Sequence, residues 1–213
     1  MDARPYSFRR MNDLADWLAA HGSSGTELLG FITGVLNVYL VTRENIWSWP
    51  LGVLNAGFYI VVFARSGLYS DTGLQVVYLV LSFYGWWHWL RGDPAQHEVL
   101  VTRTGTRHAA ILAVIAVALW GLVFSITSRI PGTKLPLLDA ALAVSSLIAQ
   151  WMMTRKLLEN WALWIALDVI YVGVFIMRGL RLTAILYAVF LLLAILGHIE
   201  WKRSFARTSR ASS

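Results

Sequence analysis

Long apolar stretches separated by short polar segments form the dominant pattern of this sequence. A helix needs about 20 mostly apolar residues to cross the hydrocarbon core of a bilayer. Runs that reach or approach this length occupy residues 27–42, 46–64, 71–90, 108–127, 135–153, 157–177 and 181–199. The first run is short, and its flanks can complete it. The pattern therefore predicts an all-α integral membrane protein with seven transmembrane helices.

The positions of the charged residues support these spans. All 18 Lys and Arg residues lie outside the apolar runs or at their edges, as expected when a cation at the centre of a membrane helix costs about 2.5–3.5 kcal/mol. Seven spans place the two termini on opposite sides, and the side of the C-terminus carries the larger share of Lys and Arg. The positive-inside rule then predicts a multi-pass protein of the cell (inner) membrane with a cytoplasmic C-terminus.

Composition narrows the possible classes of function. Hydrophobic residues make up 57% of the chain and charged residues 14%, against about 25% charged residues in an ordinary soluble domain. These figures exclude a disordered chain and most soluble enzymes. The net charge of +6 is explained by loop residues that anchor the chain to anionic headgroups of the lipid bilayer. We therefore expect no nucleic-acid partner.

An internal repeat relates the two ends of the sequence. A single ungapped alignment maps the first three apolar runs onto the last three in the same orientation. The most informative matches are Trp49 with Trp161, Tyr59 with Tyr171, Gly85 with Gly197, Trp89 with Trp201 and Arg91 with Arg203. The predicted architecture is thus 3+1+3, two parallel triple-helix repeats joined by a linker helix. Transporters with parallel repeats bind substrate between the repeats, near the membrane midplane.

The repeat divides the chain into five predicted parts. They are an N-terminal tail (1–26) with a short amphipathic surface helix at 11–20, a first repeat (27–90), a loop and linker helix (91–134), a second repeat (135–201) and a basic C-terminal tail (202–213).

One carboxylate lies near the centre of a predicted span, where a polar group needs a reason. Asp168 shares a helix face with Trp161, Trp164 and Tyr171, at i−7, i−4 and i+3 from it. Aromatic faces attract a flat cation, and a carboxylate accepts charge-assisted hydrogen bonds. The face therefore predicts a site for a flat, cationic ligand. The alternative is an aromatic belt at the membrane interface combined with an interhelical hydrogen bond.

Four polar side chains on other spans are further candidates for the substrate site: Gln75, Tyr78, Asn55 and Asn37. Gln75 and Tyr78 share one helix face, and the two asparagines lie among small residues of their own spans. We predict that all four contact substrate. The alternative is structural, because small and polar residues also bring membrane helices into close contact.

Chemistry other than transport has little support. Lys134, Lys156 and Lys202 lie outside the spans, so a retinal Schiff base inside the bundle is excluded. The histidines show no metal-binding spacing, and the sequence has no P-loop, no nucleophile elbow and no cysteine. We therefore expect no catalytic residue, no metal and no cofactor. A membrane-embedded enzyme or a receptor is the competing class.

Specific strings within residues 27–203 carry a family resemblance. They are segment 45–55 (NIWSWPLGVLN), segment 73–86 and, most specific, Glu159-Asn160-Trp161 followed by Trp164 and a polar residue at 168. The chain resembles the PnuC family of nicotinamide riboside transporters, which is related in fold to the SWEET sugar transporters.

The resemblance implies facilitated uptake of a vitamin-like nucleoside by a homotrimer, followed by trapping through cytoplasmic phosphorylation. It implies aromatic walls at Trp161 and Trp164, with Gln75 and Asn55 as polar partners. Many riboside-type members carry asparagine at the position of Asp168. A carboxylate only accepts hydrogen bonds and adds charge, which suits cationic nicotinamide riboside or thiamine and suits neutral riboflavin least. Nicotinamide riboside is the leading prediction, and thiamine or another cationic vitamin is the alternative.

Overall fold

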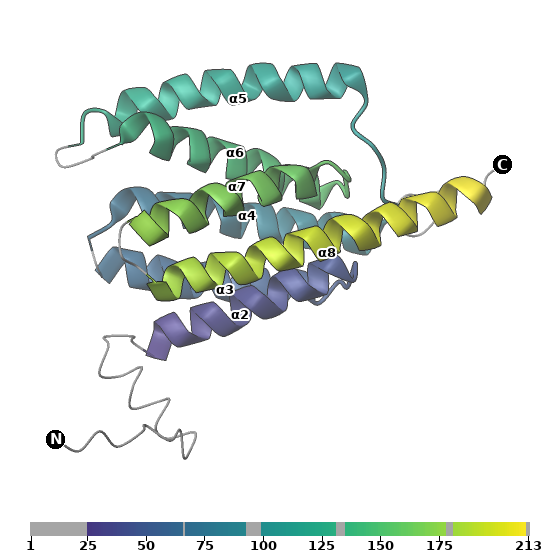
Figure 1. Cartoon of the computed structure of the whole chain (residues 1–213), viewed down its shortest axis with the longest axis horizontal. Coiled ribbons are helices and arrows are strands. Elements are labelled where there is room, and N and C mark those ends of the chain that lie inside the picture. The colour runs from purple at the N-terminus through teal and green to yellow at the C-terminus, as the bar shows by residue number, and fades with distance from the viewer. Residues whose placement is uncertain (1–24, 66, 93–98, 131–134, 178–180, 212–213) are drawn as a thin grey trace, which may run out of the picture.

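The computed structural model describes residues 25–65, 67–92, 99–130, 135–177 and 181–211, most of which are helical (Figure 1). The helices of this part of the chain are α2 (Gly25–Thr42), α3 (Ser48–Arg65), α4 (Tyr69–Arg91), α5 (Thr106–Thr127), α6 (Pro136–Thr154), α7 (Asn160–Met177) and α8 (Arg181–Ala211). Each predicted apolar run corresponds to one helix, so the all-helical fold is confirmed. The predicted surface helix at 11–20 lies outside the described residues.

Among the described residues, four helices are long and apolar enough to cross a membrane. They are α5, α6, α7 and the Thr183–Arg210 part of α8, while the apolar part of α2, Leu29–Thr42, is shorter. Polar side chains such as Asn55 in α3 and Gln75 in α4 lower the hydropathy of those helices. The length and apolar composition of these helices thus indicate a multi-pass membrane protein.

Two helix boundaries differ from the predicted runs. Helix α8 continues to Ala211 rather than ending near residue 199, because the polar residues that follow contain no glycine or proline to stop it. Helix α7 begins at Asn160 rather than at residue 157, because residues 155–159 form a turn. Lys156 in this turn has a positive φ of 49°, which no helical residue adopts.

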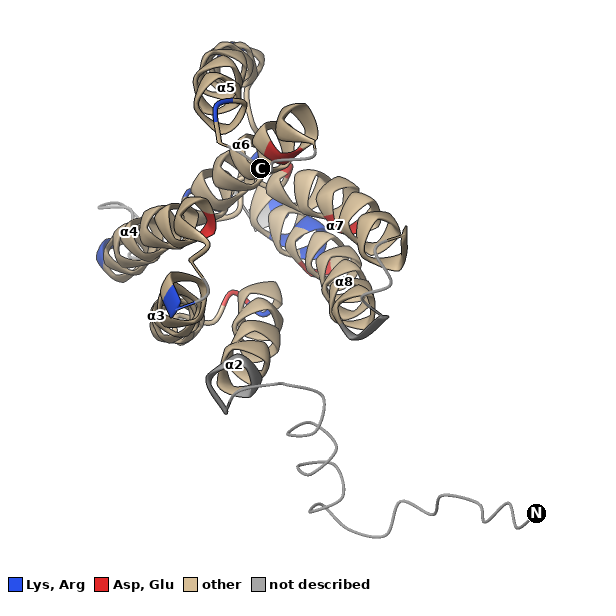
Figure 2. Ribbon diagram, turned by 90° about the vertical axis from the view of Figure 1, so that its left-hand side faces the viewer, with Lys and Arg blue, Asp and Glu red and all other residues tan. Residues whose placement is uncertain are grey.

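Six helices form a closed ring in the order α2, α3, α4, α6, α7 and α8, with α8 returning to α2 (Figure 2). Helix α5 lies outside the ring and, among the described helices, packs against α6 alone. Consecutive helices run in opposite directions, so α2, α4, α6 and α8 all end on one side. We call this side the C-terminal end of the ring and the opposite side the N-terminal end.

Four buried tryptophans organise the core at the C-terminal end. We call this group the tryptophan core: Trp49 of α3, Trp89 of α4, Trp161 of α7 and Trp201 of α8. The rings of Trp49 and Trp89 meet edge to face at 5.2 Å, and those of Trp161 and Trp201 do the same at 5.3 Å. Edge-to-face packing places the positive edge of one ring on the negative face of another. The same contact is therefore made twice, by two pairs of residues that the internal repeat aligns with each other.

A glycine lies under one tryptophan of each pair. A Cβ atom at Gly85 would overlap the ring of Trp49, and one at Gly197 would overlap the ring of Trp161. These glycines let α4 approach α3, and α8 approach α7, as small residues do between membrane helices.

Candidate functional site

The ring of Trp161 is part of the core. Trp161 is 1% exposed, and it is covered by Gly197 on one side and by Trp201 on the other. Its position does not correspond to a belt at a lipid surface, which was the alternative interpretation. Its indole N–H, however, has no hydrogen-bond acceptor.

Trp164 is partly buried and packs against the same cluster. Its indole N–H is also buried and has no acceptor among the described residues. Three more polar atoms near the starts of α3 and α7 are buried in the same way: Trp49 Nε1, Ser48 Oγ and Asn160 Oδ1. A buried polar group without a partner costs about 1–3 kcal/mol. The starts of α3 and α7 therefore hold a set of polar atoms that water or a polar ligand can satisfy.

Asp168 is the most informative residue of α7. It is 4% exposed, and within the described part of the chain no side chain or backbone N–H forms a hydrogen bond or ion pair with it, while its carboxylate oxygens are not among the fully enclosed atoms that lack a partner. An isolated carboxylate in a low-dielectric interior is strongly unfavourable unless a counter-charge or donors satisfy it. The geometry therefore leaves a place for a cationic or hydrogen-bond-donating group beside Asp168.

An aromatic cluster continues from Asp168 towards the N-terminal end of the ring. Tyr171 of α7 lies 4.7 Å from the ring of Tyr187 of α8, measured between ring centroids. Phe175 and Phe190 lie 5.1 Å and 5.8 Å from Tyr187. Such rings can surround a flat ligand and retain an edge-to-face or offset geometry.

Tyr187 is a candidate site residue that the sequence analysis missed. The phenol groups of Tyr59, Tyr78 and Tyr171 and the carboxyl of Asp168 all lie within electrostatic range of it. The internal repeat aligns Tyr187 with Gln75, which had been selected, so the repeat contained the signal. Side chains from α3, α4, α7 and α8 thus converge on one region inside the ring.

The two candidates on α4 differ in their contacts. The hydroxyl of Tyr78 donates a hydrogen bond to Ser146 Oγ and joins α4 to α6. Gln75 is partly buried one turn before it, and its amide has no hydrogen-bond partner in the described residues. The Gln75 side chain therefore keeps its donor and acceptor capacity for a ligand.

The two asparagines lie at the contacts among α2, α3 and α4. Asn55 Nδ2 donates to Gly30 O at 2.6 Å and lies 3.3 Å from Thr33 Oγ1. Asn37 and Ser82 both lie beside Gly52, 3.5 Å and 3.3 Å from the place of its missing Cβ. The amide of Asn55 thus joins α3 to α2, which agrees with the structural interpretation of this residue.

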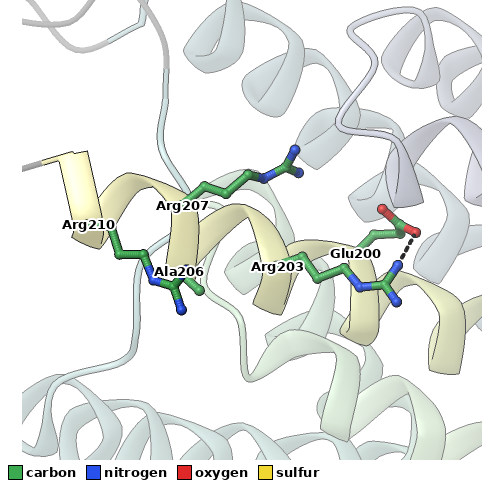
Figure 3. A pocket seen from close by; sticks show the side chains of 5 residues that line it. All are labelled: Glu200, Arg203, Ala206, Arg207 and Arg210. Carbon is green, nitrogen blue, oxygen red and sulfur yellow. Dashed lines mark hydrogen bonds and ion pairs between the residues drawn. The ribbon is translucent and has the colours of Figure 1, made fainter.

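Two hollows in the described part of the chain lie on the outer faces of α8 and α5. One groove of about 450 Å³ on the C-terminal part of α8 is lined by Glu200, Arg203, Ala206, Arg207 and Arg210 (Figure 3). Its three guanidinium groups would repel a cation, so it does not compete with Asp168 as the ligand site. No cluster of three metal-binding side chains occurs within the described ranges.

Comparison with known proteins identifies the family. Residues 24–203 match the family described as "Nicotinamide mononucleotide transporter". The nicotinamide riboside transporter PnuC of Escherichia coli (strain K12) is 30% identical over 217 residues, which cover 89% of this chain and 90% of that protein. The riboflavin/roseoflavin transporter RibM of Streptomyces davaonensis is 25% identical over 190 residues, covering 87% and 88%.

The fold also matches a solved structure. The crystal structure of the Vitamin B3 transporter PnuC superposes with a TM-score of 0.73 at 23% identity, covering 92% of this chain and 88% of that one. At this identity the likeness establishes the fold. The match over residues 24–203 and the 30% identity with PnuC of Escherichia coli show that this chain belongs to the nicotinamide mononucleotide transporter family, whose members are membrane transporters and not enzymes.

Proposed function

We propose that this protein carries nicotinamide riboside across the membrane by facilitated diffusion. The observation that supports this most directly is Asp168, buried at 4% exposure without a partner and followed by the aromatic cluster of Tyr171 and Tyr187. A pyridinium cation would supply the missing counter-charge and would fit between aromatic rings.

Charge distinguishes this substrate from a neutral vitamin. Riboflavin, which the name of RibM includes, carries no cation, so it could offer hydrogen-bond donors to the Asp168 carboxylate but no counter-charge. Leaving a buried charge unpaired is strongly unfavourable. We therefore propose that Asp168 selects cations within a family whose relatives carry different vitamins.

We propose two groups of residues in the substrate site. Trp164, Asp168, Tyr171, Gln75 and Tyr78 contact the ligand, together with the newly found Tyr187. Trp161, Asn55 and Asn37 complete the site from its edges: Trp161 through its unpartnered indole N–H, and the asparagines by positioning α2 and α3.

We propose that the six ring helices form two triple-helix repeats: α2–α4 correspond to the predicted repeat 27–90, and α6–α8 to the predicted repeat 135–201, beyond which α8 extends to Ala211. Helix α5, within residues 91–134, links them outside the ring. The paired contacts of the tryptophan core, which the repeat aligns with each other, support this arrangement. We further propose that all seven helices span the membrane, with the substrate between the repeats and the polar faces of α3 and α4 turned towards it.

The distribution of charge and the family resemblance support a proposal for the membrane, orientation and assembly of the carrier. We propose an inner-membrane protein with a cytoplasmic C-terminal end, since Arg43, Arg91, Arg155 and Arg203 all lie near that end of the ring. The exposed outer face of α5, which includes Val114 and Val117, is where we propose that protomers of a homotrimer meet. Phosphorylation of the substrate in the cytoplasm would keep uptake moving inward without an ion gradient.

Uptake into proteoliposomes tests the proposed function. Vesicles containing the purified protein should take up labelled nicotinamide riboside until internal and external concentrations are equal, and an imposed proton gradient should not change the rate. Empty vesicles are the control. No uptake above that control would contradict the proposed substrate, and uptake that requires the proton gradient would contradict facilitated diffusion.

Thiamine is the second candidate, since its thiazolium is cationic and its aminopyrimidine offers donors that a carboxylate accepts. Unlabelled thiamine and riboflavin are therefore included as competitors. If thiamine competes better than unlabelled nicotinamide riboside at equal concentration, the substrate assignment moves to thiamine while the role of Asp168 stands. Stronger competition by riboflavin would contradict both.

A further inference from the structure

A buried ion pair joins the two turns that lie at the C-terminal end of the ring. Lys156 Nζ lies 2.7 Å from Glu44 Oε2, and the side chains are 9% and 24% exposed. Glu44 belongs to the turn between α2 and α3, and Lys156 belongs to the turn between α6 and α7. The pair therefore connects helices that are far apart in sequence, 112 residues along the chain.

The two partners occupy equivalent places. The internal repeat aligns one with the other, and both have left-handed backbone conformations, with φ of 54° at Glu44 and 49° at Lys156. Residues other than glycine adopt this conformation rarely, and it concentrates at functional positions. Equivalent positions of the two repeats thus carry a negative charge in one and a positive charge in the other. The two charges form an ion pair where the two halves of the ring meet.

Two hydrogen bonds and a cation–π contact near the ion pair join the two halves at this end of the ring. Lys156 Nζ lies 4.4 Å from the centre of the Trp89 ring. Trp89 Nε1 donates to Thr154 O at the end of α6, and Trp201 Nε1 donates to Val41 O at the end of α2, both at 3.0 Å. Each tryptophan therefore comes from one half of the ring and bonds to the other half.

The segment between α4 and α5 packs against the same turn. Thr102 N donates to Lys156 O at 3.1 Å, and Leu158 N donates to Thr102 O at 2.9 Å. Val101 is 3% exposed, and Thr104 donates to Glu159 Oε2 from both N and Oγ1 at 2.8 Å. This segment holds the backbone of Lys156 in place while its side chain crosses to Glu44.

An ion pair is well suited to a closure that must open repeatedly. Two charges that leave water lose hydration free energy, and their attraction inside the protein roughly offsets this loss. When water enters, both charges are hydrated again, so separation of the pair has a small net cost. The pair Arg203–Glu200 on the exposed surface of α8 offers a comparison, because its partners are already hydrated and close nothing.

We propose that Glu44 and Lys156 form a gate residue pair, which separates to let the substrate pass the C-terminal end of the ring and re-forms to close it. This inference builds on the proposed transport function. It adds two residues that act on the permeation path at a distance from the substrate-binding side chains.

Thiol labelling tests the gate without any substrate. The sequence has no cysteine, so a single Gln75→Cys places one thiol at the proposed substrate site, on a side chain that is partly buried. Applied from the C-terminal side, a membrane-impermeant maleimide should label it slowly. In Gln75→Cys/Glu44→Ala, an unpaired Lys156 favours the hydrated, open end, and labelling should be at least about tenfold faster.

The matched control is Gln75→Cys/Glu200→Ala, which breaks the surface pair and should label at the rate of Gln75→Cys alone. Equal labelling rates with and without Glu44 would overturn the gate. If labelling depends on Glu44 but the wild-type protein moves no nicotinamide riboside, the proposed substrate fails while the gate stands.

A reversible cross-link tests whether the gate must open during transport. In Glu44→Cys/Lys156→Cys, a short reducible bis-methanethiosulfonate reagent should lower uptake to background, and dithiothreitol should restore the rate before treatment. Each single-cysteine variant should keep, after the same treatment, the uptake rate that it had before it. Undiminished uptake by the protein with a verified cross-link would overturn the proposal.

The equivalence of the two turns also allows the charges to be exchanged. Glu44→Lys and Lys156→Glu should each reduce uptake at least about tenfold, since they place like charges together. The double variant should recover to within about threefold of the wild type. A double variant as inactive as the single ones, although equally well folded, would contradict an interaction between the two residues.

Discussion

Asp168 is the residue on which the proposed preference for a cation rests. Its position near the centre of an apolar run was visible in the sequence, but its isolation from partners was not, because hydrogen bonding between helices depends on the three-dimensional ring. The structure adds that the ring of Trp161 is a core element 1% exposed to solvent, a packing that its place in an apolar run could not reveal. Tyr187 was overlooked because it lies in an ordinary apolar run, although its aligned partner Gln75 had been selected.

The glycines under the tryptophan core allow a prediction at the same scale. Gly197→Ala should destabilise the protein by about 1–3 kcal/mol, because its Cβ would overlap the Trp161 ring and force a shift in a packed core. Thermal unfolding in detergent, followed by tryptophan fluorescence, measures the effect.

The matched control is Gly173→Ala on α7, where the added Cβ meets no atom within 4 Å. This change should leave stability unaltered or raise it by up to about 1 kcal/mol, as expected from helix propensity. Equal effects at the two positions would show that the close contact of α8 with α7 does not depend on glycine.

Helices were the part of the fold that hydropathy could predict. Each apolar run became a helix, yet α3 and α4 are not apolar enough over their length to count as spans by composition, and the apolar part of α2 within the described residues is short. Hydropathy measures the preference of a segment for lipid, whereas α3 and α4 place polar side chains against other helices of the ring. The C-terminal extension of α8 was missed because its residues are polar, and its apolar contact residue Phe205 packs on the core cluster.

Hydrogen bonds between the halves of the ring give a prediction for helices α4 and α8. Trp89→Phe and Trp201→Phe each remove an indole N–H that donates across the ring at 3.0 Å. Each should lower stability by about 1–3 kcal/mol, because a buried carbonyl loses its donor. The two losses should be similar, since the two bonds occupy equivalent places.

Thermal unfolding measures the loss of stability in each of the two variants. The control is Trp47→Phe, at a residue that is 67% exposed; this change should alter stability by less than about 0.5 kcal/mol. A large loss for one core tryptophan and none for the other would show that the halves are not held together in equivalent ways.

The whole molecule combines a closed C-terminal end with a polar, aromatic interior. The internal repeat in the sequence indicated which residues correspond, but it contained no information on which ones touch. That Glu44 meets its own counterpart Lys156 follows from their position between the two halves of the ring. Neither the repeat nor the ring determines the orientation in the membrane, the assembly of protomers or the identity of the substrate, because these depend on a bilayer and on partners.

The central claim is that Asp168 selects a cation, and a pair of ligands tests it. Nicotinamide riboside and its reduced form differ mainly in that the reduced ring is uncharged. The purified wild-type protein should bind the cation at least about tenfold more tightly, a difference of about 1.4 kcal/mol, as expected for a charge-assisted contact.

The decisive measurement is isothermal titration calorimetry of both ligands with the wild type, Asp168→Asn and the surface control Glu200→Gln. We expect Asp168→Asn to reduce the preference for the cation to within about threefold, through weaker binding of the cation, while Glu200→Gln keeps the full preference. Equal affinity of the wild type for the two ligands, or an undiminished preference in Asp168→Asn, would contradict the account.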